Sequence, residues 1–258
     1  MPETAFAIET DGLVRRFGLQ AAVDGVDLRV PLGSFYGFLG ENGAGKSTTI
    51  SMLTGLLAPT AGRMRVLGRD VGADGDEIKR RIGVVPDGML LFDRLTGREH
   101  LVLVGRLYGL DRLEAGRRGD ELLAAMELQD DARKLVADYS FGMRKKLALA
   151  AALIHGPELL FLDEPFEGVD AVSKASLTAL LADLVHRRKL TVFLTSHVLE
   201  VVERLCDQVG IIHKGRLVAQ GSLADVVATV PGGGNLTDAF VRLVGEGRGE
   251  ARALSFLP

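Results

Sequence analysis

The stretch Gly40-Glu41-Asn42-Gly43-Ala44-Gly45-Lys46-Ser47 places a glycine-rich turn between an apolar segment and a helical pattern. The segment before the turn, Ser34 to Leu39, is apolar enough to form a buried strand. After the turn, apolar residues recur three or four positions apart as far as Leu57, and Pro59 ends the pattern. A strand, a glycine turn and a helix in this order favour an α/β fold, in which helices cover a parallel sheet.

The chemistry of this turn suits phosphate binding. Its spacing, a glycine and four residues before Gly45-Lys46-Ser47, matches the Walker A pattern of P-loop proteins. Glycines let backbone N–H groups converge on phosphate oxygens, and the helix N-terminus adds positive potential. We expect Lys46 to reach the β- and γ-phosphates of ATP and the Ser47 hydroxyl to bind Mg²⁺. A purely structural turn is the alternative. The expected nucleotide ligands here are Asn42, Gly43, Gly45, Lys46, Ser47 and Thr48.

An acidic pair follows a second apolar segment. Leu159 to Leu162 predicts a buried strand, and Asp163 and Glu164 come directly after it. Ligands of a parallel sheet bind beyond the carboxyl ends of its strands, so both acids have a suitable place. We expect Asp163 to orient Mg²⁺ and Glu164 to polarise the water that attacks the γ-phosphate. A solvated strand end is the alternative, which the Walker A pattern in the same chain makes less favourable.

Strand and helix patterns alternate again in the second half of the chain. Glu158–Leu162 and Leu190–Leu194 indicate buried strands, and Lys174–Val185 and Val198–Cys206 indicate helices. The first forty residues instead predict short alternating strands, which favours an antiparallel β subdomain. The predicted fold is therefore α/β, of the P-loop NTPase type, with a RecA-like parallel-sheet lobe beside this subdomain.

A helical lobe interrupts the α/β pattern. Three helices are predicted at Arg98–Tyr108, Asp120–Glu127 and Met143–Ile154. We assign residues 1–220 to one domain, formed by an α/β lobe at about 1–86 and 156–220 with the helical lobe inserted at about 87–155. Residues 221–258 form a tail, with a hinge at Pro231–Gly234 and a short helix at Leu236–Val244.

Composition narrows the classes of partner. The net charge of −3 gives no electrostatic footprint for nucleic acid, so none is expected as a ligand. Short basic clusters such as Arg144-Lys145-Lys146 are interpreted as solvated helix faces. Cys206 is the only cysteine, which fits a reducing compartment. The first residues lack the basic region of a signal peptide, and no apolar run approaches the ~20 residues of a membrane span.

One segment identifies a particular family. Tyr139-Ser140-Phe141-Gly142-Met143 lies before the acidic pair and resembles the signature of the ATP-binding cassette (ABC) family, usually Leu-Ser-Gly-Gly-Gln. Ser140 and Gly142 match it, and the other three positions depart in the manner of ATPase subunits of drug, lipid and polysaccharide exporters. The resemblance implies that Ser140 and Gly142 contact ATP held by a second subunit, in a head-to-tail dimer around two nucleotides. The start of an ordinary amphipathic helix is the alternative.

Further positions resemble the same family. Asp170, in Glu167-Gly168-Val169-Asp170, resembles the D-loop aspartate that communicates between paired sites. His197, after a predicted strand, resembles the switch histidine that senses the γ-phosphate, and Phe17 resembles the aromatic residue that stacks on adenine. A lone histidine or phenylalanine is more often structural. Asp87 departs from the family, which usually has glutamine there to reach Mg²⁺ and the attacking water, so the resemblance leaves its catalytic and metal-binding role open.

The resemblance implies an ATPase, with Glu164, His197, Lys46 and Asp87 in catalysis and Ser47, Asp163 and Asp87 at Mg²⁺. Its partners would be a second ATPase subunit, as a homodimer or a paired cassette, and a separate multi-span membrane permease. The chain would lie in the cytoplasm, peripheral to the cell membrane, and would power transport through the permease, most readily export. The alternatives are a soluble ABC ATPase acting on ribosomes or DNA, a P-loop kinase, and a regulatory cassette that only binds nucleotide.

Overall fold

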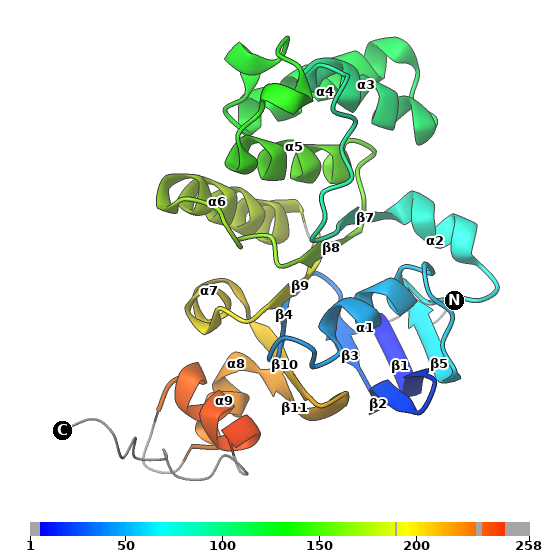
Figure 1. The fold of residues 1–258 in the computed structure, drawn as a ribbon, viewed down its shortest axis with the longest axis vertical. Coiled ribbons are helices and arrows are strands. Elements are labelled where there is room, and N and C mark those ends of the chain that lie inside the picture. Colours follow the sequence, from blue (N-terminus) through cyan, green and yellow to red (C-terminus); the bar gives the residue numbers. More distant parts are fainter. Residues whose placement is uncertain (1–5, 189, 231–233, 246–258) are drawn as a thin grey trace, which may run out of the picture.

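The computed structural model describes residues 6–188, 190–230 and 234–245, which form two sheets covered by helices (Figure 1). The larger sheet has neighbouring strands in the order β11-β10-β4-β9-β8-β7. The five strands from β10 to β7 are parallel, and β11 is antiparallel to β10. The bounds are β4 Phe35–Leu39, β7 Ile82–Val85, β8 Leu159–Asp163, β9 Thr191–Ser196, β10 Gln208–His213 and β11 Arg216–Ser222.

The smaller sheet is antiparallel and comes mainly from the start of the chain. Its central strand β1 pairs with β2, β3 and β5, and β5 pairs with β6. The bounds are β1 Phe6–Phe17, β2 Gln20–Val26, β3 Arg29–Pro31, β5 Ala61–Val66 and β6 Arg69–Asp70. The predicted fold class, a parallel-sheet lobe with an antiparallel β subdomain and inserted helices, is confirmed.

The helices fall into groups along the larger sheet (Figure 1). Helices α3, α4 and α5 lie together at the end of the molecule near β7, while α8 and α9 lie near β10 and β11. Within the described ranges, no helix is long and apolar enough to cross a bilayer. The bounds are α1 Lys46–Leu53, α2 Gly75–Arg81, α3 Gly97–Leu107, α4 Arg112–Ala125, α5 Phe141–Leu153, α6 Ala171–Arg188, α7 Leu199–Leu205, α8 Leu223–Ala228 and α9 Leu236–Gly245, with 3-10 turns at Gln129–Asp131 and Val136–Asp138.

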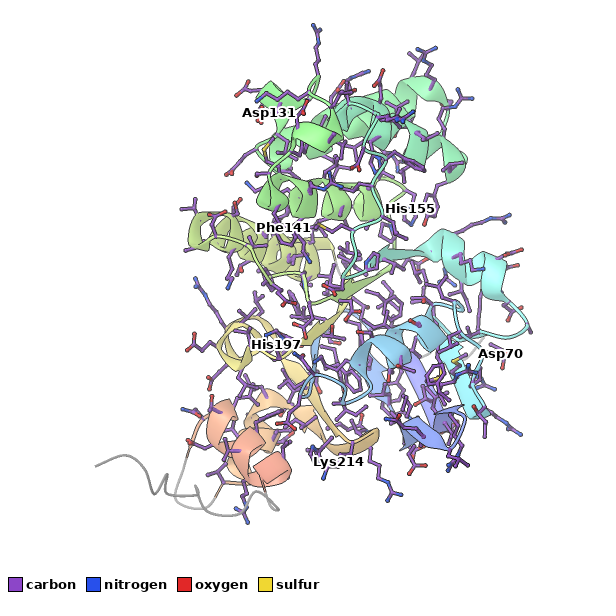
Figure 2. The ribbon with its side chains drawn as sticks, in the orientation of Figure 1. Asp70, Asp131, Phe141, His155, His197 and Lys214 are labelled. Atoms are coloured by element: carbon purple, nitrogen blue, oxygen red, sulfur yellow. The ribbon has the colours of Figure 1, made fainter. Side chains whose placement is uncertain are left out.

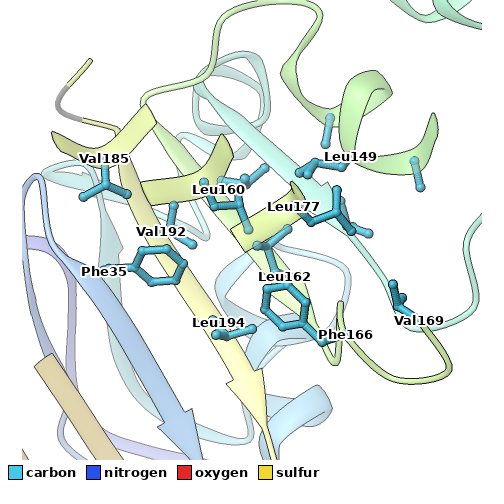
Figure 3. Packing of buried hydrophobic residues seen from close by; sticks show 14 of the residues in the cluster. Phe35, Leu149, Leu160, Leu162, Phe166, Val169, Leu177, Val185, Val192 and Leu194 are labelled. Atoms are coloured by element: carbon cyan, nitrogen blue, oxygen red, sulfur yellow. The ribbon is translucent and has the colours of Figure 1, made fainter. Parts of the chain in front are cut away.

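Side-chain alternation along the buried strands builds two cores. Leu160 and Leu162 of β8 face the cluster that contains Leu177 of α6 (Figure 3). Leu159 and Phe161, the alternate residues of the same strand, belong to the second cluster, which joins α1 to the antiparallel sheet. The strand is therefore apolar at every position because both of its faces are covered.

One predicted helix boundary was wrong. The helix expected from Asp120 begins eight residues earlier, at Arg112, because the Asp111 carboxylate accepts hydrogen bonds from the first N–H groups. Gly116 and Gly119 hide the helical pattern in the sequence, although α4 packs against α3 and a Cβ at Gly119 would make an ordinary contact with Leu101, at 3.4 Å. The hinge predicted at Pro231–Gly234 lies mostly outside the described residues.

The interpretation of Arg144-Lys145-Lys146 as a solvated helix face was wrong. Lys145 and Lys146 expose only 3% and 7% of their surface. They lie on α5, which packs against α3, α4 and β7, so that even its basic turn is enclosed. Lys146 reaches outward to an ion pair with Glu127, at 2.8 Å, whereas Lys145 points toward the end of β8.

A glycine in β7 sets how closely α5 approaches the sheet. A Cβ atom at Gly83 would overlap the carbonyl oxygen of Ala152 and lie 2.9 Å from Leu160 Cδ1. We therefore expect Gly83→Ala to lower the free energy of unfolding by about 2–3 kcal/mol, the cost of overpacking a core. Gly88→Ala is the control, because a Cβ there meets no atom within 4 Å. Equal urea midpoints for the two variants would contradict the packing described.

Candidate functional site: a phosphate cradle at the ends of parallel strands

The turn after β4 contains two glycines in backbone conformations that other residues rarely adopt. Gly43 and Gly45 have φ angles of +79° and +112°, and a Cβ at Gly45 would overlap the carbonyl oxygen of Ala22. Helix α1 begins at Lys46, and its first bond of the α-helical pattern runs from the Thr49 N–H to the Gly45 carbonyl, at 2.9 Å. The N–H groups of residues 46–48 precede that bond, so the helix end offers donors to an anion.

Lys46 is buried within this turn. Its Nζ donates to the Gly40 carbonyl oxygen at 2.8 Å and to the Glu41 carbonyl oxygen at 3.4 Å. The same amine lies 3.2 Å from Glu164 Oε1. Glu164 Oε1 is buried and accepts no hydrogen bond from the described residues. The contact with Lys46 is therefore an ion pair without the geometry of a hydrogen bond. An ammonium group has three N–H donors, and here two of them bond to carbonyl oxygens. The third can therefore serve a phosphate oxygen beside the helix end.

The acidic pair lies where β8 ends. Asp163 is buried and pairs in register with Thr195 of β9. The Thr195 hydroxyl donates to Asp163 Oδ1 at 2.5 Å and accepts from the Glu164 N–H at 3.1 Å. Sequence analysis had not assigned Thr195 to the site; its place directly before Ser196-His197 at a strand end was the available signal. The Thr195 hydroxyl therefore holds both the Asp163 carboxylate and the Glu164 backbone in place.

The Thr195 hydroxyl predicts a measurable stability difference. Thr195→Val keeps the volume but removes a donor from buried Asp163 and an acceptor from the Glu164 N–H. We expect the free energy of unfolding to fall by about 1–3 kcal/mol, the cost of leaving such groups unpaired. Thr195→Ser retains the hydroxyl and should lose less in urea denaturation. A larger loss for the serine variant would show that the methyl group, not the hydroxyl, matters.

Glu164 occupies the centre of the site. Its Oε1 faces Lys46, and its Oε2 lies 3.0 Å from Nδ1 of His197, which follows β9. Glu164 also has a φ of +47°, which is uncommon for a residue with a side chain. The structure therefore brings together Lys46, Asp163, Glu164 and His197 from three separate parts of the sequence, as expected from the ends of neighbouring parallel strands.

A cavity of about 380 Å³ opens in front of this group. Asp87 lines it, together with the expected nucleotide ligands of the turn and with Glu41 and Glu167, which sequence analysis had not assigned. The full lining is Ala22, Glu41, Asn42, Gly43, Gly45, Lys46, Ser47, Thr48, Asp87, Glu164 and Glu167. Its four carboxylates outnumber the single lysine, so a polyphosphate requires a cation to enter with it.

The donor set fits a hard cation. The Ser47 hydroxyl, the Asp163 carboxylate and the Asp87 carboxylate supply oxygen ligands, which Mg²⁺ prefers. Among the described residues, no group of three or more histidine, cysteine or acidic side chains forms a ready metal cage. Mg²⁺ commonly binds through one or two carboxylates together with the phosphates of its substrate, so the few oxygen donors present are of the right kind.

Of the expected residues that do not line the cavity, three lie next to one another. Ser140 begins α5 and accepts a hydrogen bond from the Met143 N–H at 3.3 Å. Asp170 begins α6 in the same way, accepting from Val172 and Ser173, and the Ser173 N–H is the main cause that holds the pKa of Asp170 below its usual value. A Cβ at Gly142 would lie 3.5 Å from Asp170 Oδ2, so the signature segment and the D-loop segment are in contact.

Two aromatic side chains, one in the signature segment and one at the end of β1, are exposed. Phe141, 48% exposed, lies at the start of α5, on a different element from His197, which follows β9 (Figure 2). Its ring packs over Gly168. Phe17, 52% exposed, ends β1 outside the cavity lining, and the Arg15 guanidinium lies 4.6 Å from its ring centroid. Both rings can therefore be reached by a ligand or a second chain.

The fold and the site define a P-loop nucleotide-binding protein, and comparison with known proteins specifies the family. The family model described as "ABC transporter" matches residues 23–167. The chain therefore belongs to the ABC transporter family, as an ATP-binding and ATP-hydrolysing subunit.

Relatives and solved structures agree with this family. The bacitracin transport ATP-binding protein BcrA of Bacillus licheniformis is 41% identical over 83% of this chain and 69% of its own length. The daunorubicin resistance ATP-binding protein DrrA3 of Streptomyces coeruleorubidus is 42% identical over 93% and 75%. A solved ATP-binding subunit of an ABC transporter is 31% identical and has a TM-score of 0.84, covering 92% of this chain and 99% of that one.

Proposed function

We propose that this chain hydrolyses ATP to drive a separate multi-span membrane permease, and that the assembly is an exporter. The observation that carries the ATPase part is the contact of Glu164 with both Lys46 and His197, beside a cavity that Lys46 and Glu164 line at the P-loop. Support for export comes from the relatives, which are named for bacitracin transport and daunorubicin resistance. In this proposal the chain works at the cytoplasmic face of the membrane, and nucleic acid is not a partner.

The proposed domain division keeps the predicted bounds, although the boundary after residue 220 falls within β11. Residues 1–220 form the ATPase domain, with the helical subdomain at about 87–155 containing α3, α4 and α5. Residues 221–258 form the tail. Its helices α8 and α9 contribute Val226, Leu236 and Ala239 to the same core as β8 and α6, so the tail supports the domain by packing.

Two chains complete each site in this proposal. Ser140, Gly142 and the N-terminus of α5 lie on the surface, away from their own chain's cavity lining. A second chain in head-to-tail orientation would bring these donors to the γ-phosphate held by the first. Asp170, in contact with the signature segment, would report the state of one site to the other, and Phe17 would stack on adenine. The second chain is a copy of this one or a paired cassette.

The chain's own residues perform the reaction as follows. Lys46 turns its amine from Glu164 to the β- and γ-phosphates, which frees the carboxylate. Glu164 then accepts a hydrogen bond from the water placed in line with the γ-phosphate and polarises it. His197, held at 3.0 Å from Glu164, orients that carboxylate and reaches the γ-phosphate. The oxygen atoms of Ser47, Asp163 and Asp87 would hold Mg²⁺, whose charge would offset part of the negative charge of the phosphates.

A second cavity, of about 340 Å³, gives the permease a place to bind. It lies between β7 and the segments at α1 and α2 on one side and α3 and α5 on the other, and its lining includes Pro86, next to Asp87. Leu90 and Leu56, which line it, are 86% and 73% exposed. An apolar groove of this kind suits a short helix of the membrane subunit, whose movement would follow opening and closing of the site.

Co-purification from native membranes tests the proposal. We expect the tagged chain, solubilised in mild detergent, to recover a multi-span protein in stoichiometric amount. Leu90→Glu should abolish recovery because it places a charge in the groove, whereas Leu113→Glu, on the equally exposed surface of α4, should not. Recovery with ribosomes or nucleic acid, or an unchanged yield for Leu90→Glu, would contradict the proposal.

A further inference from the structure

Lys145 lies in an unusual place for a lysine that has no assigned role. It is on the second turn of α5 and exposes 3% of its surface, although lysine is almost never fully buried without a partner. Its Nζ donates to the main-chain carbonyl oxygen of Glu164 at 3.2 Å. The amine therefore extends from the signature helix to the backbone of the residue at the centre of the site.

The Glu164 backbone needs such support. A residue with a side chain and a φ of +47° carries a cost of about 1–3 kcal/mol, and it persists only where its surroundings hold it. Thr195 accepts from the Glu164 N–H at 3.1 Å, which holds one side of the residue. Lys145 holds the other side through the carbonyl oxygen. Together they fix the direction in which the carboxylate points, between Lys46 and His197.

The charges around the amine favour a cation. Four carboxylates act on it, those of Asp87, Glu167, Asp163 and Glu164. Burial lowers the pKa of Lys145, and the attraction of these acids opposes that effect. The Lys145 Nζ lies 5.6 Å from the centroid of the Phe141 ring, so the ring covers the amine on the side of the signature segment. Lys145 thus offsets the negative charge that Asp87 adds to the cavity.

We propose that Lys145 is a positioning residue for ATP hydrolysis, which holds the Glu164 backbone so that the carboxylate faces the attacking water. This inference rests on the proposed role of Glu164. It assigns to α5 a function within its own chain, in addition to the contact that its first residues would make with the partner's ATP.

Lys145→Met tests the proposal, with Lys146→Met as the matched control. The control removes a neighbouring amine that is also buried, but this amine pairs with Glu127, away from the cavity. We expect Lys145→Met to lower kcat about 10- to 100-fold, the range for misplacement of a catalytic group, while KM for ATP changes less than about threefold. Lys145→Arg, which keeps a donor and the charge, should recover at least a third of the wild-type kcat.

A second readout does not depend on hydrolysis. Amide hydrogen exchange of the nucleotide-free chain should become faster in the peptide from Leu162 to Asp170 in Lys145→Met, and should stay unchanged there in Lys146→Met. Unchanged exchange in this peptide together with unchanged kcat would overturn the positioning role. A wild-type chain without ATPase activity would instead overturn the proposed function, and the exchange experiment would still decide whether Lys145 holds Glu164.

Discussion

Replacing Glu164 by glutamine is expected to slow ATP hydrolysis by roughly 10²–10⁴-fold, the usual contribution of a general base. Glutamine has nearly the same shape, so Oε1 and the packing around it are kept. It has no charge, so it neither pairs with the Lys46 amine, 3.2 Å away, nor polarises a water molecule strongly. The measurement is the steady-state rate of phosphate release at saturating ATP.

The same variant separates catalysis from binding. ATP affinity should stay within about threefold of wild type or increase, since the carboxylate competes with phosphate for Lys46. Glu158→Gln is the control, because Glu158 precedes the opposite end of β8 and pairs with Arg81 on the surface. A Glu164→Gln chain that hydrolyses ATP at the wild-type rate would remove Glu164 from its proposed role.

Replacing Lys46 by alanine is expected to weaken ATP binding at least ~100-fold. Its amine would make charge-assisted hydrogen bonds to two phosphates, each contributing about 1.5–3 kcal/mol. Among the residues that the structure describes, no other lysine lines the cavity, and the carboxylates of the cavity would then repel the nucleotide without an opposing amine. Equilibrium dialysis with labelled ATP measures the change directly.

Folding must be checked in parallel, because Lys46 also supports the apo site. It is the ion-pair partner of partly buried Glu164 and a donor to the Gly40 carbonyl, so its loss should lower the melting temperature of the nucleotide-free chain. Added ATP should raise the melting temperature of wild type but not of Lys46→Ala. Lys134→Ala, at an exposed surface pair with Asp131, should behave as wild type. An intact ATP-induced shift in Lys46→Ala would contradict the cradle.

The sequence was most informative where backbone geometry and chemistry coincide. The turn at Gly40 to Ser47 needs glycines at positive φ and a helix immediately after it, and both requirements can be read from the residues. The acids at the end of β8 could also be predicted. A strand buried on both faces must be apolar throughout, so the first polar residues after it mark the strand end.

Contacts between distant segments could not be read in this way. Lys145 looks like part of a solvated basic run, and only the packing of α5 against β7, α3 and α4 buries it. Thr195 looks like an ordinary strand residue until β8 and β9 pair in register and bring its hydroxyl to Asp163. The start of α4 was hidden by Gly116 and Gly119, which weaken the helical pattern, although the Asp111 cap and packing against α3 hold the helix in the folded chain.

Phe17 and Asp87 remain predictions about ligands. Phe17 is exposed beneath the Arg15 guanidinium, so an adenine ring would have to share or replace that cation. Asp87 lines the cavity with three other acids, where the neutral glutamine usual in the family would add no charge. The effect of that charge depends on Mg²⁺ and on the permease, neither of which local sequence patterns describe.

The most direct test of the central claim, that two chains close around two ATP molecules, is the mass of Glu164→Gln in solution by light scattering. With ATP and Mg²⁺ the account predicts a particle of twice the 27.6 kDa chain, which returns to a single chain when nucleotide is removed. Ser140→Glu should prevent its formation by opposing the partner's phosphates. A mass that stays at one chain while ATP is demonstrably bound would contradict the account.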